Sequence, residues 1–379
     1  MSCYLSLSQI VAFAALGSVF ALRAADTLVY FGTTTEKTSE GVYLSRFDSA
    51  TGTLSPATLA AKVTHPMFLN LHPNQHVLYA IGERNDAAGK VLGTIEAFTI
   101  NASTGALTPL NHQIAGDDAV CYVAIDKTGR TALAVSYRQG YVVSFPVRAD
   151  GSLGERVSFI QHTGKGVHER QEGPHAHCID LDPANGIALV ADLGIDQVVS
   201  YKLDSAQSTL TQQPEPFHSK PGAGPRHVAF SADGRHVYII NEIDSTLTLA
   251  DHNAGTGRLV EKQTVSLLPT HFKGENTAAE VMVHPSGKFL YASNRGHDSL
   301  ALFALAPDTG RLTFVEYMSK GVKHPRHFAI DPTGRWLLCA NRDADTVTVY
   351  KIDPANGHLT ATKAIAKVPM PTCIKFVGR

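Results

Sequence analysis

The chain has almost no excess of charge of either sign. It carries 33 Lys and Arg against 34 Asp and Glu, and its formal net charge is -1 over 379 residues. This balance gives no electrostatic reason to expect nucleic acid or an acidic membrane surface as a partner. Disorder is excluded as well, because short apolar runs recur regularly from Leu28 onward. We therefore expect a globular protein with no nucleic-acid partner.

The sequence also lacks an apolar run long enough to cross a membrane. Ile10–Leu22 spans 13 residues, too few for a helix through a hydrocarbon core of about 30 Å. Its length and the small residues that follow it are typical of a secretory signal, although no Lys or Arg precedes it. We interpret residues 1–25 as an export signal, which predicts a periplasmic or secreted protein with no membrane span. The alternatives are an apolar first strand or a wrongly assigned start codon, and an unused signal would leave the protein cytoplasmic.

Cysteines are few, and several catalytic motifs are missing. The five cysteines are Cys3, Cys121, Cys178, Cys339 and Cys373, with no CxxC or zinc-type spacing. We expect the last four to be small buried residues on strands, and the sequence does not indicate any disulfide pairing. No G-x-S-x-G, phosphate-loop or dinucleotide fingerprint occurs, so nothing supports a serine nucleophile or a nucleotide cofactor.

What the sequence does contain is an internal repeat. Three stretches share one pattern: GPRHVAFSADGRHVYIINE from Gly224, AAEVMVHPSGKFLYASNR from Ala278 and HPRHFAIDPTGRWLLCANR from His324. Each has an apolar run, a turn ending in glycine, a second apolar run and then two further strand-like segments, which makes four strands per unit. The turn glycines Gly129, Gly186, Gly234, Gly287 and Gly334 lie 57, 48, 53 and 47 residues apart. Units of about 50 residues with four short strands are typical of propeller blades.

The number of units predicts how the ring closes. Six complete units are present, with the weaker copies beginning near Pro66, Ala119 and Pro174. The segments from Leu28–Thr34 onward match the last three strands of a seventh unit, and Pro371–Val377 matches its first strand. We therefore predict an all-β, seven-bladed β-propeller over residues 26–379, closed by N- and C-terminal strands in one blade and expected to be a monomer. Such closure leaves no open sheet edge.

Strand parity sorts the polar residues onto two faces. The starts of the first strands and the loops after the second strands share one face, the mouth face, whereas the glycine turns share the opposite turn face. The mouth face is predicted to carry His175, His177, Arg226, His227, Glu280, Arg326 and His327 at strand starts, and Glu242, Arg295 and His297 after second strands. In the other blades the strand-start positions hold Met67, Phe68, Cys121 and Tyr122. This distribution predicts a pocket with a cationic side and an apolar wall.

A single Arg or His at a propeller mouth is more often a strand-end residue than a functional one, so the prediction rests on the cluster. Several like charges facing one cavity repel each other unless an anion joins them. His175 and His177 point to the same side of a strand, but no third ligand lies at a helpful spacing, and we expect no metal. Glu242, beside Arg226 and Arg295, is expected to orient the ligand or to act as a general base, and the alternative is a solvated surface residue.

Four segments carry a family resemblance: GPHAHCIDLDP from Gly173, VADLGIDQVVSY from Val190, GAGPRHVAFSADGRHVYIINE from Gly222 and AAEVMVHPSGKFLYASNRGHDSLALF from Ala278. Together they resemble the seven-bladed lactonase family, which includes propeller-type 6-phosphogluconolactonase and carboxy-cis,cis-muconate lactonizing enzyme. The resemblance implies hydrolysis or formation of a lactone without a cofactor. Carried over position by position, the implied catalytic residues are His175 (with His177 close by), Arg226, Glu242 and Arg295. Thr34 stands where relatives more often have tyrosine.

The function we expect is hydrolysis of a sugar-acid lactone, as in 6-phosphogluconolactonase. His175 or Glu242 would take a proton from the attacking water, and Arg226 and Arg295 would hold the oxyanion and any phosphate or carboxylate. The neighbouring substrate-binding residues are expected to be His227, Glu280, His297, Arg326 and His327. The alternatives are the cyclising, muconate-type direction of the same chemistry and a non-catalytic exported binding propeller.

Overall fold

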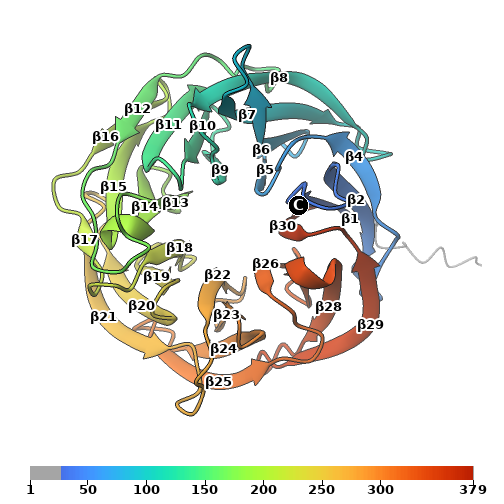
Figure 1. Cartoon of the computed structure of the whole chain (residues 1–379). Helices are drawn as coiled ribbons and strands as arrows, with labels where there is room; N and C mark the ends of the chain where they lie inside the picture. The colour runs from blue at the N-terminus through green and yellow to red at the C-terminus, as the bar shows by residue number, and fades with distance from the viewer. Residues whose placement is uncertain (1–26, 379) are drawn as a thin grey trace, which may run out of the picture.

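The computed structural model describes residues 27–378, in which strands form seven separate antiparallel sheets around a central axis (Figure 1). Strands that are consecutive in sequence pair with each other, so each sheet is one blade. The prediction of seven four-stranded blades is therefore confirmed. The proposed export signal, residues 1–25, lies outside the described residues.

Within each blade the strands are stacked in order from the propeller axis, where the first strand lies, to the rim of the ring, where the outer strand lies. The first strands are β5 (Leu69–Leu71), β9 (Tyr122–Ile125), β13 (Ala176–Leu181), β18 (Pro225–Phe230), β22 (Thr277–Val283), β26 (Pro325–Ile330) and β30 (Pro371–Val377). The second strands are β6 (Val77–Asn85), β10 (Thr131–Val135), β14 (Ile187–Asp192), β19 (His236–Asn241), β23 (Phe289–Arg295), β27 (Trp336–Asn341) and β1 (Thr27–Thr33). The third strands are β7 (Val91–Ile100), β11 (Tyr141–Pro146), β15 (Gln197–Asp204), β20 (Thr246–His252), β24 (Ser299–Leu305), β28 (Thr346–Ile352) and β2 (Gly41–Asp48). The outer strands are β8 (Leu107–Gly116), β12 (Ser158–Gln161), β16 (Thr209–Gln212) with β17 (Phe217–His218), β21 (Leu259–Ser266), β25 (Leu312–Met318), β29 (Leu359–Lys367), and β3 (Thr53–Leu54) with β4 (Thr58–Lys62).

The ring is closed by strands from both ends of the chain. In this blade β30 pairs antiparallel with β1, from Leu28 opposite Val377 to Thr33 opposite Pro371. Figure 1 shows β30, at the red end of the chain, lying beside the blue β1. The predicted pairing of Pro371–Val377 with the N-terminal strand is therefore confirmed. The outer position of this blade is shared by β3 and β4, which both pair with β2.

The apolar core lies between neighbouring blades. The buried clusters draw side chains from adjacent sheets, such as Tyr238 and Leu249 packed with Leu290 and Phe303. Second strands such as β14 are buried at every position because both of their faces are covered. This explains why their sequences are continuous apolar runs rather than alternating patterns.

Two local devices repeat from blade to blade. On the turn face, Asp331 Oδ1 accepts hydrogen bonds from the backbone amides of Arg335 and Trp336 at 2.9 and 2.8 Å, and Gly334 adopts a φ of 70° that favours glycine. Between blades, tyrosine hydroxyls of second strands donate to a glycine carbonyl of the next blade, as from Tyr291 to Gly357 at 2.6 Å. Four of the five turn glycines that revealed the repeat, Gly129, Gly234, Gly287 and Gly334, thus have a backbone conformation that favours glycine, whereas beside Gly186 the positive φ falls on Asn185.

Two further expectations concern cysteines and membranes. The four cysteines of the described region are free thiols, and three of them are buried. Among residues 27–378 no helix is long and apolar enough to span a membrane.

Candidate active site

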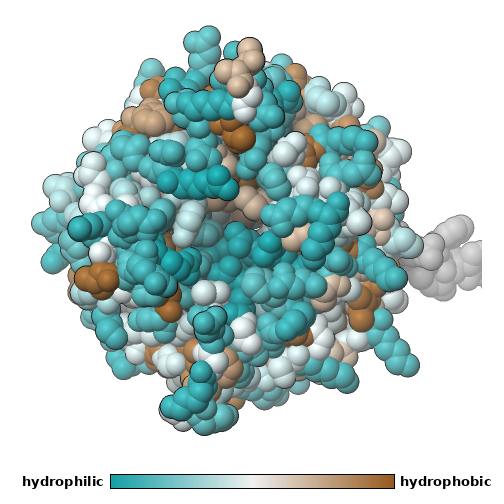
Figure 2. All heavy atoms as spheres, viewed as in Figure 1, coloured by the Kyte–Doolittle hydropathy of each residue, from teal (hydrophilic) through white to brown (hydrophobic). Residues whose placement is uncertain are grey.

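A cavity of about 300 Å³ opens at the centre of the mouth face. Figure 2 shows this face hollowed at its centre and surrounded by hydrophilic residues. The lining residues are Met67, Ala119, Val120, Cys121, Tyr137, Arg138, Arg170, His177, Glu242, Arg295 and Arg326. Four arginines therefore face one carboxylate, and Met67, Val120 and Cys121 supply an apolar wall. This is the volume and character of a small-molecule site that receives an anion.

A repeated β-bulge places three of the functional side chains. In β13, β18 and β26 the pairing with the second strand shifts by one residue, which leaves His177, Arg226 and Arg326 as the extra residue of each bulge. A bulge re-aims the side chain of its extra residue, and bulges are frequent beside active sites. The same strand position thus delivers an imidazole or a guanidinium toward the propeller axis in three of the blades, and His177 and Arg326 line the mouth cavity.

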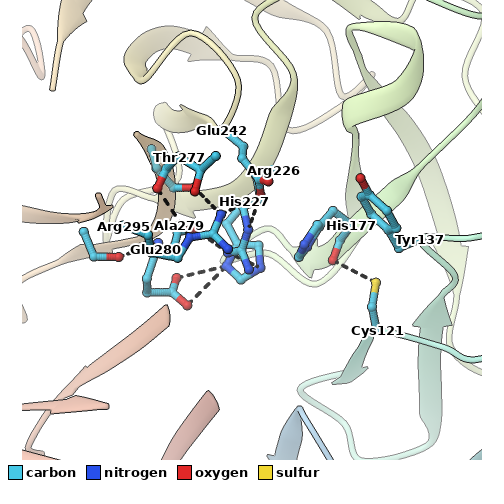
Figure 3. A network of polar contacts seen from close by, with 12 residues as sticks. Cys121, Tyr137, His177, Arg226, His227, Glu242, Thr277, Ala279, Glu280 and Arg295 are labelled. Atoms are coloured by element: carbon cyan, nitrogen blue, oxygen red, sulfur yellow. Dashed lines mark hydrogen bonds and ion pairs between the residues drawn. The ribbon is translucent and has the colours of Figure 1, made fainter. Parts of the chain in front are cut away.

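Glu242 organises the arginines. It follows β19 and is buried, with Arg226 Nε and Arg295 Nη2 at 2.8 and 2.9 Å from its Oε2 (Figure 3). Arg170 Nη2 lies 2.5 Å from its Oε1. Burial alone would raise the pKa of Glu242, but the three guanidinium groups hold it well below its usual range. Glu242 is therefore a permanent anion at physiological pH.

Arg226 and Arg295 are also tied to the backbone. Arg226 Nη1 donates to the Ala279 carbonyl at 2.5 Å, and Arg295 Nη2 donates to the Ala278 carbonyl at 3.0 Å. Burial lowers the pKa of Arg295 to about 10, although Glu242 opposes the shift. Both guanidinium groups are thus charged and fixed in place by strand ends and by Glu242. Arg295 reaches the cavity, whereas Arg226 lies one layer deeper, against a small void beneath it.

Arg326 differs from these arginines because it has no partner. It lines the cavity, and within residues 27–378 its side chain makes no hydrogen bond or ion pair. Burial, together with repulsion from Arg226 and Arg295, lowers the pKa of Arg326 to about 9, so it still carries its charge at neutral pH. A half-buried guanidinium without a counter-ion, beside other arginines, favours binding of an anion.

His177 is a neutral base facing the same cavity. Its ring is buried, its Nδ1 has no hydrogen-bond partner in the described structure, and its centroid lies 5.5 Å from Tyr137 and 5.2 Å from His227. Burial, and then the charges of Arg226 and other neighbours, hold the pKa of His177 well below its usual value. The ring is therefore unprotonated at physiological pH and able to accept a proton.

His175 lies beside the cavity rather than in its lining. Its ring stacks on Tyr137 at 4.5 Å between centroids, and its Nδ1 donates to the Tyr137 carbonyl at 2.6 Å. Its backbone amide donates to Asp192 Oδ1 at 2.7 Å. This arrangement fixes Tyr137, whose side chain does line the cavity.

A deeper layer contains His227, Glu280 and His327. His227 Nε2 accepts from Arg226 Nη1 at 3.1 Å, and its Nδ1 donates to Glu280 Oε1 at 3.1 Å (Figure 3). His327 Nε2 lies 3.4 Å from Glu280 Oε2. Glu280 itself lines a separate cavity that opens on the turn face. These three residues, expected to bind substrate, therefore lie under the arginines instead of lining the mouth cavity.

His297 lies away from the cavity. Its Nδ1 is 2.7 Å from the Ser299 hydroxyl, and its ring packs edge-on against Phe272 and Tyr317, with centroids at 5.0 and 5.2 Å. Of the ten predicted site residues, His177, Glu242, Arg295 and Arg326 line the mouth cavity.

Two hydrogen-bonded residues of the cavity, Tyr137 and Arg170, were not indicated by the sequence. Tyr137 follows β10, and Arg170 lies in the strand-free segment of residues 163–174 that precedes β13. The one available signal was the charged His168-Glu169-Arg170 triplet directly before the Gly173–Pro183 motif. Within residues 27–378 no group of three or more His, Cys, Asp or Glu side chains could hold a metal ion.

Several known proteins that resemble this chain are named as lactonases. The 7-bladed β-propeller lactonase family matches residues 28–376. The 6-phosphogluconolactonase of Bacillus subtilis is 37% identical over 349 residues, which cover 92% of this chain and 97% of that protein. The periplasmic gluconolactonase of Pseudomonas aeruginosa has a TM-score of 0.87 and 33% identity, covering 93% of this chain and 99% of its own. A putative 6-phosphogluconolactonase from Bacteroides fragilis has a TM-score of 0.86 and 32% identity, and the match covers 94% of this chain and 99% of that protein.

These matches span nearly the whole propeller and confirm the expectation of an enzyme, a carboxylic ester hydrolase. The chain belongs to the seven-bladed β-propeller lactonase family.

Proposed function

We propose that the chain hydrolyses a sugar-acid lactone that carries an anionic group, with 6-phosphogluconolactone as the leading candidate. The observation that carries this proposal is the unpaired guanidinium of Arg326 next to the neutral imidazole of His177 in one cavity. An anion on the substrate would supply the counter-ion that Arg326 lacks. The name of the Bacillus subtilis relative supports the phosphorylated substrate.

His177 is the best candidate for the general base. Both carboxylate oxygens of Glu242 are already occupied by arginines, Arg170 at Oε1 and Arg226 and Arg295 at Oε2. The Nδ1 of His175 is already bonded to a carbonyl, and its ring stacks outside the lining. His177 would take a proton from water as the water oxygen attacks the lactone carbonyl carbon.

The arginines would stabilise the charge that forms during this attack. The carbonyl oxygen becomes an oxyanion beside Arg295, which Glu242 and a backbone carbonyl hold in place. As the ring C–O bond breaks, the protonated His177 would return its proton to the leaving alkoxide. The product is an open-chain hydroxy acid, which releases one proton when it ionises at neutral pH. Arg226 supports this arrangement from below by holding Glu242.

The substrate assignment is tested by comparing three lactones. Purified protein is assayed on 6-phosphogluconolactone, gluconolactone and a muconolactone, alongside the Arg326→Gln variant and an Asp233→Ala control on the turn face. Loss of one charge-assisted contact should raise KM for the phosphorylated lactone by about 10- to 100-fold, with little effect on gluconolactone. Equal effects on both sugar lactones would argue against an anion contact, and no turnover of any lactone would favour a binding propeller.

Export of the protein is a separate proposal with consequences for the substrate. The apolar run Ile10–Leu22 supports a signal peptide that is removed after Ala21, Ala24 or Ala25. An exported enzyme would meet unphosphorylated sugar lactones, as the name of the Pseudomonas aeruginosa relative suggests for that protein. Intact-mass measurement on protein from its own cells should find a chain that starts between residues 22 and 26. A mass that includes Met1, or a purely cytoplasmic pool, would contradict export.

A further inference from the structure

The arginine that the sequence did not indicate, Arg170, is attached to the site differently from the others. Its guanidinium contacts only side chains: Nη2 lies 2.5 Å from Glu242 Oε1 and 3.3 Å from the Tyr137 hydroxyl. Arg226 and Arg295 donate to backbone carbonyls as well as to Glu242. The side chain of Arg170 is also 35% exposed, against 2% and 7% for those two. Arg170 is therefore the arginine of this group that can change partner without breaking a backbone hydrogen bond.

The segment that carries Arg170 is nevertheless held firmly beside the cavity. The neighbouring Gln171 is fully buried, and its Nε2 donates to the Leu193 carbonyl at 2.7 Å and to Asp196 Oδ1 at 2.8 Å. Its Oε1 accepts from the backbone amides of Val167 and His168 at 3.1 and 3.0 Å. Gln171 thus fixes the backbone at Arg170, so any change of partner is a rotation of the side chain alone. The Arg170 side chain spans the mouth from the blade of Tyr137 to the blade of Glu242.

Release of Arg170 would leave no buried charge unpaired. Glu242 would keep Arg226 and Arg295, at 2.8 and 2.9 Å from its Oε2. The cost of breaking a buried ion pair arises mainly when the remaining charge has no partner, which is not the case here. The freed guanidinium lines the same cavity as the unpaired Arg326.

We propose that Arg170 is the residue that selects a doubly charged substrate, moving from Glu242 to the anionic group of the lactone when that group is a phosphate monoester. This inference rests on the proposed lactone hydrolysis at this site. A phosphate monoester carries a charge of about -1.5 to -2 near pH 7 and offers three acceptor oxygens, so Arg326 alone cannot neutralise it. A carboxylated lactone needs only Arg326, and a neutral lactone leaves Arg170 on Glu242. The planar fork of arginine suits both carboxylate and phosphate, which allows the exchange.

Steady-state kinetics of Arg170→Gln and Arg170→Lys on 6-phosphogluconolactone and gluconolactone test this role. We expect Arg170→Gln to raise KM for the phosphorylated lactone by about 10-fold or more, while kcat changes little and KM for gluconolactone stays within about 2-fold. Arg170→Lys keeps the charge but loses the planar fork of the guanidinium, so its KM for the phosphorylated lactone should lie between that of the wild type and that of Arg170→Gln. Arg84→Gln is the matched control, because Arg84 forms a comparable side-chain pair with buried Glu96 outside this cavity.

Other results would overturn the inference. Equal losses on both lactones, or a fall in kcat alone, would mean that Arg170 acts through Glu242 as a structural support. A lower KM in Arg170→Gln would mean that Arg170 only obstructs the mouth.

Calorimetric titration with 6-phosphogluconate separates this inference from the proposed function. If the wild type hydrolyses no lactone but binds 6-phosphogluconate in an Arg170-dependent way, the proposed function fails and the role of Arg170 stands. If the wild type is active but its affinity for 6-phosphogluconate is the same in Arg170→Gln, the role of Arg170 fails.

Discussion

At the scale of single residues, the site is dominated by an imbalance of charge. One carboxylate, Glu242, contacts three arginines, and a fourth, Arg326, has no partner in the described structure. This excess of positive charge has two effects. It makes the cavity attractive to an anion, and it adds to burial in keeping His177 unprotonated. Substrate binding and base catalysis thus depend on the same arginines.

The pH dependence of catalysis tests the role of His177. The pKa of a free histidine is near 6.5, and that of His177 is held well below it by burial and by Arg226. Because the base is active when deprotonated, kcat of the wild type should persist as the pH falls through 6.5 and decline only at clearly lower pH. The His177→Gln variant should lose about 10²- to 10⁴-fold in kcat. His175→Gln, which removes the ring stacked on Tyr137, should lose less in kcat than His177→Gln. A pH profile of kcat with an acid limb centred at 6.5, or a larger loss of kcat in His175→Gln, would point to another base.

At the scale of elements, the central question is how a ring of separate blades stays closed. Blade-to-blade contact is made by apolar clusters and by hydrogen bonds such as that from Tyr238 to the Gly310 carbonyl at 2.9 Å. Only the blade of β1 and β30 is assembled from the two ends of the chain. The closing strand β30 is also bonded to the next blade near the axis, where the Thr372 hydroxyl donates to the Met67 carbonyl at 2.9 Å.

Removal of β30 should therefore open the ring. Deletion of residues 371–379 exposes the edge of β1 and removes Ile374 and Phe376 from the apolar cluster that they share with the neighbouring blade. We expect aggregation or loss of a cooperative thermal transition, measured by size-exclusion chromatography and circular dichroism. Deletion of residues 378 and 379 alone, beyond the end of β30, is the control and should leave folding intact. A soluble, monomeric, cooperatively folded Δ371–379 protein would contradict closure by this strand.

The sequence predicted the blades well because their turns need particular residues. Gly234, Gly287 and Gly334 all have φ near 70°, and that local requirement marks each unit in the sequence. Strand parity then placed Glu242, Arg295 and Arg326 on the correct face. It could not separate residues that line the cavity from those one layer below, such as His227. The depth of a side chain along the axis is a tertiary feature, and the bulges of β13, β18 and β26 that re-aim His177, Arg226 and Arg326 have no residue signature. Arg170 was missed because its segment has no strand period.

At the scale of the whole molecule, the propeller axis is a column of buried titratable groups. His177, His227 and His327 are all buried there. Burial, with repulsion from nearby cations, holds the pKa of His177 and His227 well below the usual value and lowers that of His327 to about 3. The rings of Phe68 and Tyr122, stacked with centroids 3.8 Å apart, pack edge-on against His227. Folding thus places three histidines where burial and nearby cations favour their neutral forms.

The stability of the fold should consequently depend on pH in the range where histidine titrates. Each of these groups has a lower pKa folded than unfolded, so the unfolded chain binds more protons below pH 6.5, and the free energy of unfolding should fall as the pH is lowered. The slope reaches about 1.4 kcal/mol per pH unit for each histidine once the pH is below its unfolded pKa. Carboxylates such as Glu242, whose folded pKa is lowered, add a further loss only when the pH falls through their unfolded range near 4. Urea unfolding at pH 7.5, 6.5, 5.5 and 4.5 measures this dependence, and His327→Gln, which removes one of the three groups, should reduce the slope between pH 6 and 5 by up to about 1.4 kcal/mol per pH unit. A free energy of unfolding that stays constant from pH 7.5 to 5.5 would mean that the axis admits protonated histidines, and that the neutral state assigned to His177 is wrong.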